Sequence, residues 1–87
     1  MKVSIRYFAS LREALGPGEP LELALAEGAV PTVGQLRDAL IARSAAHAAA
    51  LDRRRAVRSA LDQVLCTEKA GVHEGAEVAF FPPVTGG

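Results

Sequence analysis

Residues 77–87 read EVAFFPPVTGG, and this stretch decides how the chain closes its fold. Residues 78–81, after Glu77, form an apolar run that favours a β-strand. Pro82 and Pro83 end the predicted strand, because proline has no N–H to donate to a neighbouring strand. We therefore expect a folded domain over residues 1–81 and an extended tail over residues 82–87.

Outward from this stretch, the N-terminal residues 2–8 alternate between apolar and polar side chains. This alternation predicts a strand with one face toward the core, while Phe8 falls on the opposite face. The expected core-facing residues are Val3, Ile5 and Tyr7. Residues 21–25 alternate in the same way and predict a second strand, which the short link would allow to pair antiparallel with the first.

A short helix is predicted between these two strands. Ser10 as the N-cap and Glu13 three residues later form a candidate capping box, in which each side chain accepts a hydrogen bond from the other residue's backbone N–H. The sequence Gly16-Pro17-Gly18 should stop this helix after about two turns, because glycine and proline are both unfavourable inside a helix.

The main helix is predicted in the middle of the chain. Thr32 and Gln35 form a second candidate capping box, and apolar residues then recur at helical spacing. These apolar residues are Val33, Leu36, Leu40 and Ile41. We expect the helix to end between Ser44 and Ala50, and residues 59–66 to form a third strand.

The predicted order is strand, short helix, strand, long helix, strand, strand, which is typical of an α+β fold. One main helix would lie across one face of a mixed sheet of four to five strands, with the short helix after the first strand. The first and last strands would lie side by side and parallel at the centre of the sheet.

Ten basic and ten acidic residues cancel, so the composition favours neither a nucleic acid nor a membrane as partner. The charges are unevenly spread, because residues 31–58 are mainly basic and residues 59–87, which include the tail, are mainly acidic. The single cysteine, Cys66, cannot form an internal disulfide, which favours a reducing compartment. No apolar run approaches the roughly 20 residues of a membrane span. We therefore expect a soluble, cytoplasmic protein.

The tail ends in Gly86 and Gly87, which could pass through a channel too narrow for a Cβ atom. The Gly87 carboxylate is a poor electrophile, but an activating enzyme could convert it to an acyl-adenylate that a sulfur or amine nucleophile attacks. The alternative is that the two glycines are a frayed chain end without function. Their position directly after a strand and two prolines favours the functional interpretation.

Residues 75–87 read GAEVAFFPPVTGG, residues 3–13 read VSIRYFASLRE, and residues 31–36 read PTVGQL. The first of these stretches resembles the C-terminal signature of the family of small, sulfur-carrier subunits of molybdopterin synthase. The other two are similar to the first strand and to the entry of the long helix in that family. The resemblance implies a ubiquitin-like β-grasp fold for the domain over residues 1–81.

The resemblance also implies that the chain carries sulfur on Gly87 as a thiocarboxylate and is not an enzyme by itself. An E1-like adenylyltransferase would use ATP to adenylate Gly87, and a sulfur donor protein would supply the sulfur. The large synthase subunit would receive the charged tail and pass the sulfur to a pterin precursor, with two carriers and two large subunits forming a heterotetramer. The chain itself would bind no cofactor and no metal. The inserted tail would consist of Pro82, Pro83, Val84, Thr85, Gly86 and Gly87.

Strand parity predicts a docking patch at the root of the tail. Phe8 and Phe81 both fall on the sheet face that the main helix leaves uncovered, on strands expected to be neighbours. The alternative is that either ring folds into a minor core. The resemblance adds Leu65 to this patch and Arg12 beside it.

The remaining side chains indicate neither a metal site nor a catalytic nucleophile. His47 and His73 have no cysteine or carboxylate at ligand spacing, and Cys66 is expected to be a small buried hydrophobic residue. The run Arg53-Arg54-Arg55, with Arg58, predicts a solvated loop, and contact with an acidic partner surface is the alternative.

Three other functions stay open. A related carrier could supply sulfur to thiamine, cysteine or tungsten-cofactor synthesis, and a protein modifier could use the same adenylate to form an isopeptide bond. The third alternative is an interaction domain with an inert tail. The chain also departs from the common family pattern in the predicted third strand, at residues 60–62 (ALD), and at residues 75–78 (GAEV). Both departures affect local turn geometry, but neither lies in the tail.

Overall fold

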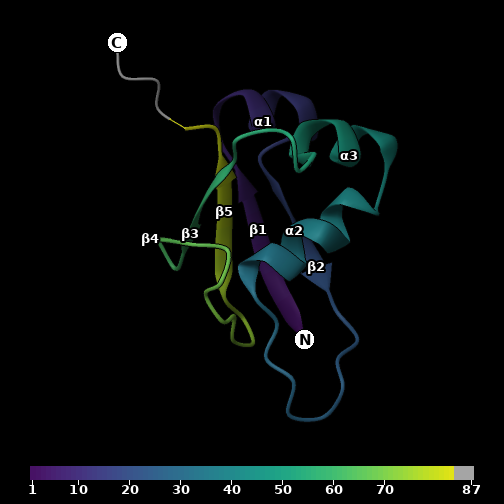
Figure 1. Ribbon diagram of the computed structural model, residues 1–87, viewed down its shortest axis with the longest axis vertical. Coiled ribbons are helices and arrows are strands. Elements are labelled where there is room, and N and C mark those ends of the chain that lie inside the picture. Colours follow the sequence, from purple (N-terminus) through teal and green to yellow (C-terminus); the bar gives the residue numbers. More distant parts are fainter. Residues whose placement is uncertain (84–87) are drawn as a thin grey trace.

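The computed structural model describes residues 1–83 of the chain. Helices α2 and α3 lie on one side of a five-stranded sheet, and α1 lies at the end of the sheet where β5 finishes (Figure 1). In chain order the elements are β1 (Lys2–Tyr7), α1 (Ala9–Leu15), β2 (Gly18–Glu22), α2 (Val33–Ile41), α3 (Ala45–Leu51), β3 (Arg58–Leu61), β4 (Val64–Cys66) and β5 (Glu77–Phe81). No helix among residues 1–83 is both long enough and apolar enough to cross a bilayer.

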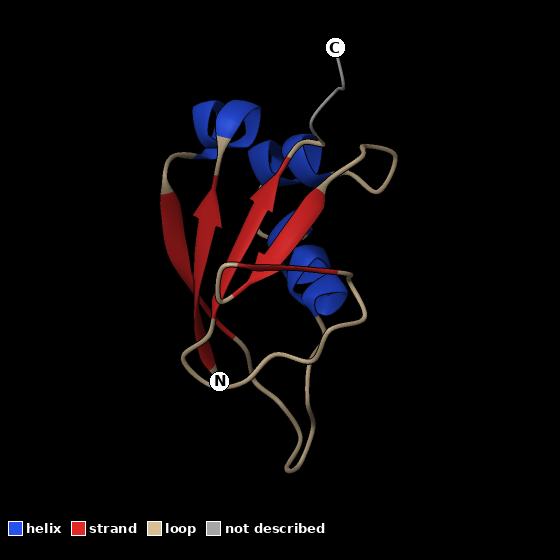
Figure 2. Cartoon of the chain, turned by 90° about the vertical axis from the view of Figure 1, so that its left-hand side faces the viewer, coloured by secondary structure: helices blue, strands red, loops and turns tan. Residues whose placement is uncertain are grey.

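The sheet has the strand order β2-β1-β5-β3-β4, which Figure 2 shows from a second direction. The central strands β1 and β5 are parallel, and the other neighbouring pairs are antiparallel. The prediction of a mixed sheet with its first and last strands paired at the centre is therefore confirmed. Pro20 lies on the edge strand β2, where the missing N–H of proline discourages pairing with another chain.

One face of this sheet carries the core. The alternating residues of β1 and β5 are almost completely buried on this face, and they pack against apolar residues of α2. The main contributors are Val3, Ile5, Tyr7, Val78, Phe80, Leu36 and Leu40. Full burial of side chains of this size contributes about 1.5–3 kcal/mol each, so this face supplies most of the driving force for folding.

The short helix does not begin as predicted. Its N-cap is Phe8 rather than Ser10, and no side chain caps it. The backbone N–H of Phe8 still donates to the Phe80 carbonyl of β5, at 3.2 Å, and the Phe8 carbonyl then accepts from the N–H groups of Leu11 and Arg12. Because one residue both ends the strand and opens the helix, the Ser10–Glu13 capping box is not used. Gly16, with a φ of 88°, ends the helix as predicted.

The main helix starts as predicted and ends earlier. Thr32 and Gln35 form the predicted capping box, but α2 ends at Ile41. The alanine-rich continuation is a separate helix, α3, whose N-cap Ser44 accepts a hydrogen bond from the His47 N–H at 3.1 Å. The predicted end between Ser44 and Ala50 was wrong. The Ser44 hydroxyl caps a new helix through the His47 N–H, and this local hydrogen bond competes with continuation of α2.

The predicted strand over residues 21–25 is shifted to Gly18–Glu22. Its register pairs Glu22 with Lys2, and the Leu23 N–H donates to the Met1 carbonyl, so β1 offers no partner beyond this point. Leu25 is consequently 38% exposed instead of packing in the core.

The predicted strand over residues 59–66 is two strands, β3 and β4, joined by a tight turn. Asp62 and Gln63 both have positive φ, 50° and 69°. Two such residues are what a two-residue hairpin turn of the type I′ class requires. The turn was missed because neither residue is glycine.

Candidate functional site

The root of the tail is the point where β5 ends. Phe81 is the last residue of β5, and Pro82 and Pro83 follow it as half-buried residues. Because β1 and β5 are parallel, both strands finish at this end of the sheet, as Figure 2 shows. The last part of the predicted tail lies outside the described residues, so its assignments stay predictions. This part consists of Val84, Thr85, Gly86 and Gly87.

Phe8 and Phe81 lie side by side at this root. The last pair in the parallel ladder is Tyr7 with Phe80, and Phe8 keeps an extended backbone one step further on. Its side chain therefore lies on the face opposite Tyr7, where it is 41% exposed, and Phe81 is partly exposed. The structure places neither ring in the main core cluster.

Leu65 lies on the same face, two strands away from β5. Ala60 of β3 pairs with both Leu65 of β4 and Ala79 of β5, and paired residues share a face of the sheet. Leu65 is 67% exposed, whereas the two alanines are nearly covered. Five apolar residues thus share this face of the sheet and are here called the open-face patch, in which Phe8 and Leu65 are exposed and the two alanines lie nearly buried between the strands. Its residues are Phe8, Ala60, Leu65, Ala79 and Phe81.

The sequence analysis did not include Ala60 in the patch, because the parity of residue 60 depends on the hairpin that it missed. It also did not indicate Arg6 and Arg58, which flank the aromatic pair. The guanidinium carbon of Arg6 lies 5.8 Å from the centre of the Phe8 ring, a cation–π distance. Arg58 pairs with Phe81 across the β3–β5 ladder. Arg12 is exposed on α1, one turn after Phe8.

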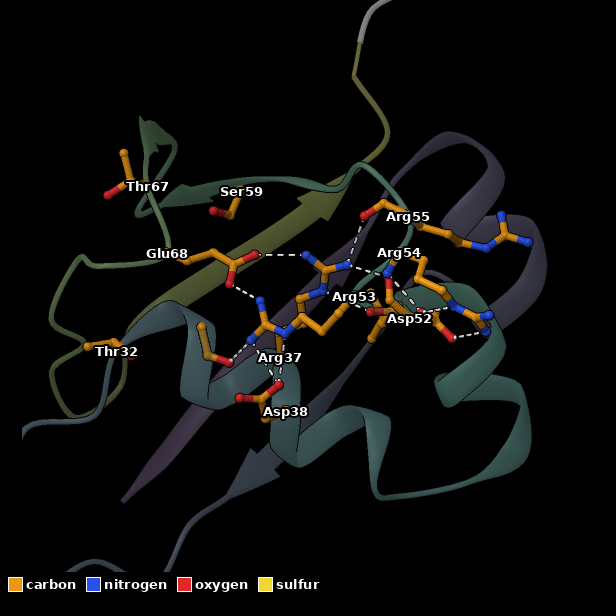
Figure 3. Close-up of polar contacts among 12 residues, drawn as sticks. Thr32, Arg37, Asp38, Asp52, Arg53, Arg54, Arg55, Ser59, Thr67 and Glu68 are labelled. Carbon is orange, nitrogen blue, oxygen red and sulfur yellow. Dashed lines mark hydrogen bonds and ion pairs between the residues drawn. The ribbon is translucent and has the colours of Figure 1, made fainter.

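A buried arginine holds the basic loop that leads into β3. Arg37 of α2 is only 3% exposed. Its guanidinium donates to the backbone carbonyls of Leu51, Asp52 and Arg55, at 2.8, 2.7 and 3.0 Å. It also forms an ion pair with Glu68 at 2.8 Å (Figure 3). The backbone of the loop is therefore fixed from inside the domain.

The predicted solvated arginine loop is only partly correct. Arg53 donates to the Gly34 carbonyl at 2.8 Å and forms ion pairs with Asp38 and Glu68 (Figure 3). Burial alone would raise the pKa of the Glu68 carboxyl, but hydrogen bonds from Arg53 and Arg37 outweigh it and lower that pKa. Arg53 is thus held by specific contacts within the domain, although its side chain stays 43% exposed.

Comparison with known proteins agrees with this geometry. The sequence model of the ThiS family matches residues 5–87, which is nearly the whole chain. The chain belongs to the ThiS family.

Individual relatives of this ThiS-family chain include a curated protein and two crystal structures. The molybdopterin synthase sulfur carrier subunit of Escherichia coli (strain K12) is 38% identical over 85 residues, covering 98% of this chain and 99% of the relative. SAMP1 from Haloferax volcanii is 26% identical with a TM-score of 0.70 and full coverage of both chains. The structure of small archaeal modifier protein 1 from the same organism is 25% identical with a TM-score of 0.68, covering 95% of this chain and 98% of that one. The resemblance to sulfur-carrier subunits and the ubiquitin-like β-grasp fold are confirmed.

A second polar cluster of this ThiS-family chain joins β2 to α3, away from the root of the tail. The Glu19 carboxylate accepts from the Tyr7 hydroxyl at 2.7 Å and from Arg43 at 2.5 Å, and lies 2.7 Å from the His47 imidazole. Burial alone would raise the Glu19 pKa, but these hydrogen bonds outweigh it and lower that pKa. Burial, and then the bond to Glu19, raises the pKa of the Tyr7 hydroxyl. The contact of His47 with Glu19 is structural, and residues 1–83 contain no group of three metal-ligating side chains.

Replacing Glu19 by glutamine tests this cluster. We expect Glu19→Gln to lower the free energy of unfolding by about 1–2 kcal/mol near neutral pH, because hydrogen bonds to a charged group are lost. The Glu19 pKa is lower in the folded state, so its stabilisation is present above the unfolded pKa and is lost as the pH falls through the folded one. Urea unfolding should therefore show a difference in the free energy of unfolding between the wild type and Glu19→Gln that is smaller at about pH 3 than at about pH 7. An equal difference at both pH values would contradict this role.

Both turns at which the sequence departs from the family pattern are stabilised by Asp62. Its carboxylate accepts from the Glu77 N–H at 3.0 Å and lies 2.6 Å from the His73 imidazole. One side chain thus ties the β3–β4 turn to the start of β5. Ala76, which stands in the second departure, is completely buried.

The contact between Asp62 and His73 predicts a shift in the pKa of His73. The hydrogen bond to Asp62 raises the pKa of His73, so Asp62→Asn should return that pKa toward the ordinary value of about 6.5. A two-dimensional NMR titration of the histidine ring protons measures this directly, with His47 as the internal control. An unchanged His73 titration curve would show that the pair does not form in solution.

Proposed function

We propose that the chain is the sulfur-carrier subunit of a molybdopterin synthase and that Gly87 is its reactive residue. The observation that carries this proposal is the near full-length similarity to the E. coli carrier subunit. The sequence FFPPVTGG at residues 80–87 supports it, because the described part of this segment leaves the domain next to an exposed apolar patch.

The proposed chemistry takes place on the carboxyl carbon of Gly87. An E1-like adenylyltransferase binds ATP and joins AMP to the Gly87 carboxylate with release of pyrophosphate. A sulfur donor protein supplies sulfide, which displaces AMP and leaves a thiocarboxylate. The large synthase subunit then receives the tail, and the sulfur attacks the pterin precursor. In this scheme the chain binds no cofactor and is not an enzyme without the large subunit.

The side chains have positioning roles in this scheme. Pro82 and Pro83 stiffen the exit from the domain, because proline restricts the backbone to extended conformations. Val84, Thr85 and Gly86 fill the partner's channel. The open-face patch docks on the partner, with Arg12 beside it, in the manner of an interface with an apolar centre. We further propose a heterotetramer with two large subunits, in the cytoplasm.

The experiment that tests the function is the intact mass of the chain after incubation with an activating enzyme, ATP and a sulfur donor. The expected product is heavier by the exchange of one oxygen for sulfur, and fragmentation places the change in the C-terminal peptide. A chain that stays unmodified while a known carrier is converted in parallel would contradict the proposal.

The second candidate function is that of a protein modifier, because one similar structure is named a small archaeal modifier protein. Such a modifier would use the same adenylate but end in an isopeptide bond between Gly87 and a lysine. Recovery of the chain from cells in covalent conjugates, with no thiocarboxylate form, would favour this candidate. A carrier for thiamine, cysteine or tungsten-cofactor synthesis would be distinguished from a molybdopterin synthase subunit by testing which synthase accepts its sulfur.

A further inference from the structure

The root of the tail is surrounded by arginines, although residues 59–87 are mainly acidic in sequence. The topology explains this arrangement. The parallel strands β1 and β5 end together, and β3, which is antiparallel to β5, begins at the same end. Arg6 near the end of β1 and Arg58 at the start of β3 therefore flank Phe8 and Phe81.

Arg55 adds a third charge at this end. Its backbone is fixed, because its carbonyl accepts from Arg37 at 3.0 Å and its N–H donates to the Asp52 carbonyl at 2.8 Å. Figure 3 shows its guanidinium extending away from the cluster of Arg37 and Glu68. It lines a hollow of about 280 Å³ together with Pro82 and Pro83, the root of the tail itself.

These arginines differ from the others in having no carboxylate partner within residues 1–83. Arg37 and Arg53 pair with Glu68, Arg43 pairs with Glu19, and Arg54 pairs with Asp52. Arg6, Arg12, Arg55 and Arg58 form no ion pair among the described residues and are all exposed.

The acidic residues of the segment 59–87 lie away from the root of the tail or already bind other side chains. Glu68 is held by two arginines, and Asp62 is bound to His73. Glu74 accepts from the Lys2 N–H at the start of β1, and Glu77 begins β5 at the far end of the sheet. The segment that carries the tail is acidic in composition, but its acidic side chains do not lie at the root, where arginines contributed mainly by other segments gather.

We infer that Arg6, Arg55 and Arg58, together with Arg12, form a basic collar that docks against a carboxylate-rich surface around the tail channel of the large synthase subunit. This inference rests on the proposed function and adds the chemistry of the partner surface. A charged rim around an apolar centre is the usual anatomy of a protein interface. Rim charges mainly accelerate association and set orientation, and guanidinium groups bind carboxylates in a defined bidentate geometry.

The collar is tested by removing two of its charges in the full chain. Arg55→Gln/Arg58→Gln should lower the association rate constant for the purified large subunit about three- to tenfold at low salt, and the difference should shrink below about twofold in 0.5 M salt. Stopped-flow fluorescence gives the rate and equilibrium titration gives the affinity. Neither side chain has an ion-pair partner among the described residues, so the variant should fold, and thermal unfolding checks this.

Two further variants serve as matched controls. Lys2→Gln/Lys69→Gln removes the same charge from exposed sites outside the collar and should leave the rate within about twofold. Arg55→Lys/Arg58→Lys keeps the charge and should retain most of the salt dependence. Agreement with all three expectations supports the collar.

The opposing outcomes are distinguishable. If the wild-type chain forms no complex with the large subunit, the proposed function fails and the collar with it. If a complex forms but the arginine variant behaves like the Lys2/Lys69 control, or its defect persists in high salt, the collar alone is wrong. The collar is also wrong if the arginine variant associates more slowly with the activating enzyme but binds the large subunit at the wild-type rate.

Discussion

A chain extended by one alanine after Gly87 is expected to form the thiocarboxylate at least a hundredfold more slowly than the unextended chain. The extension places the Gly87 carbonyl in a peptide bond, so the atom that must be adenylated is no longer a carboxylate. The new carboxylate lies one residue further along and carries a Cβ atom beside it. A shift of about 1 Å in a reacting group can already cost a hundredfold in rate, so we expect at least this loss. Intact-mass measurement over time gives the rate of sulfur incorporation.

The matched control for this extension changes the tail without moving its end. Thr85→Ser removes one methyl group and leaves the Gly87 carboxylate in register, so sulfur incorporation should stay within about threefold of wild type. The carrier hypothesis would be contradicted if the extended chain gained sulfur as fast as the unmodified chain. Removal of the added alanine by a carboxypeptidase should restore activity and would exclude misfolding as the cause.

The largest expected effect on stability comes from Arg37. Replacing Arg37 with methionine keeps much of the buried aliphatic volume but removes four hydrogen bonds, one of which is the ion pair with Glu68. Glu68 and the carbonyl groups of Leu51, Asp52 and Arg55 lose their shared donor. Glu68 keeps its ion pair with Arg53, so most of the cost comes from the three carbonyl groups. A buried acceptor left without a donor costs about 1–3 kcal/mol, and we therefore expect a total loss of about 3–5 kcal/mol. Small domains have only about 5–15 kcal/mol of stability, so this variant should be close to unfolding.

Urea unfolding followed by circular dichroism measures this loss. The control is Arg54→Met, because the Arg54 side chain is 90% exposed and, among residues 1–83, pairs only with Asp52. A surface pair of this kind contributes little, so the control should unfold almost as the wild type does. A loss below about 1 kcal/mol for Arg37→Met would show that the loop holds without its buried donor.

Local patterns predicted those parts of the fold that depend on a few neighbouring residues. The alternation in residues 2–8 placed Val3, Ile5 and Tyr7 in the core and Phe8 on the other face. The box of Thr32 and Gln35 located the start of α2. The same reasoning failed at Ser10, because the N–H of Phe8 already bonds to β5 and moves the helix start. It failed again at residues 59–66, where a turn at Asp62 and Gln63 needs no glycine.

Some residues of the candidate site were likewise found from local sequence patterns, and others only from the tertiary structure. Phe8 and Phe81 were found from strand parity, which also fixes the faces of Arg6 and Ala79. The positions of Ala60 and Arg58 depend on the hairpin and on which strands become neighbours. The tail assignments at residues 84–87 came from sequence and remain predictions. Arg53 was misjudged because its partners Asp38 and Glu68 lie 15 residues away on either side.

The amino-acid sequence by itself determined the strand that precedes the tail and the residues of the first strand that face the core. It also determined the family to which the chain belongs. Only the tertiary structure decided the electrostatics, for example that Arg37 would neutralise Glu68 across 31 residues while Arg55 and Arg58 keep exposed charges at the tail root. The reason is physical. Backbone preferences and side-chain periodicity act over a few residues, whereas the energy of an ion pair depends on distance and burial after the chain has closed.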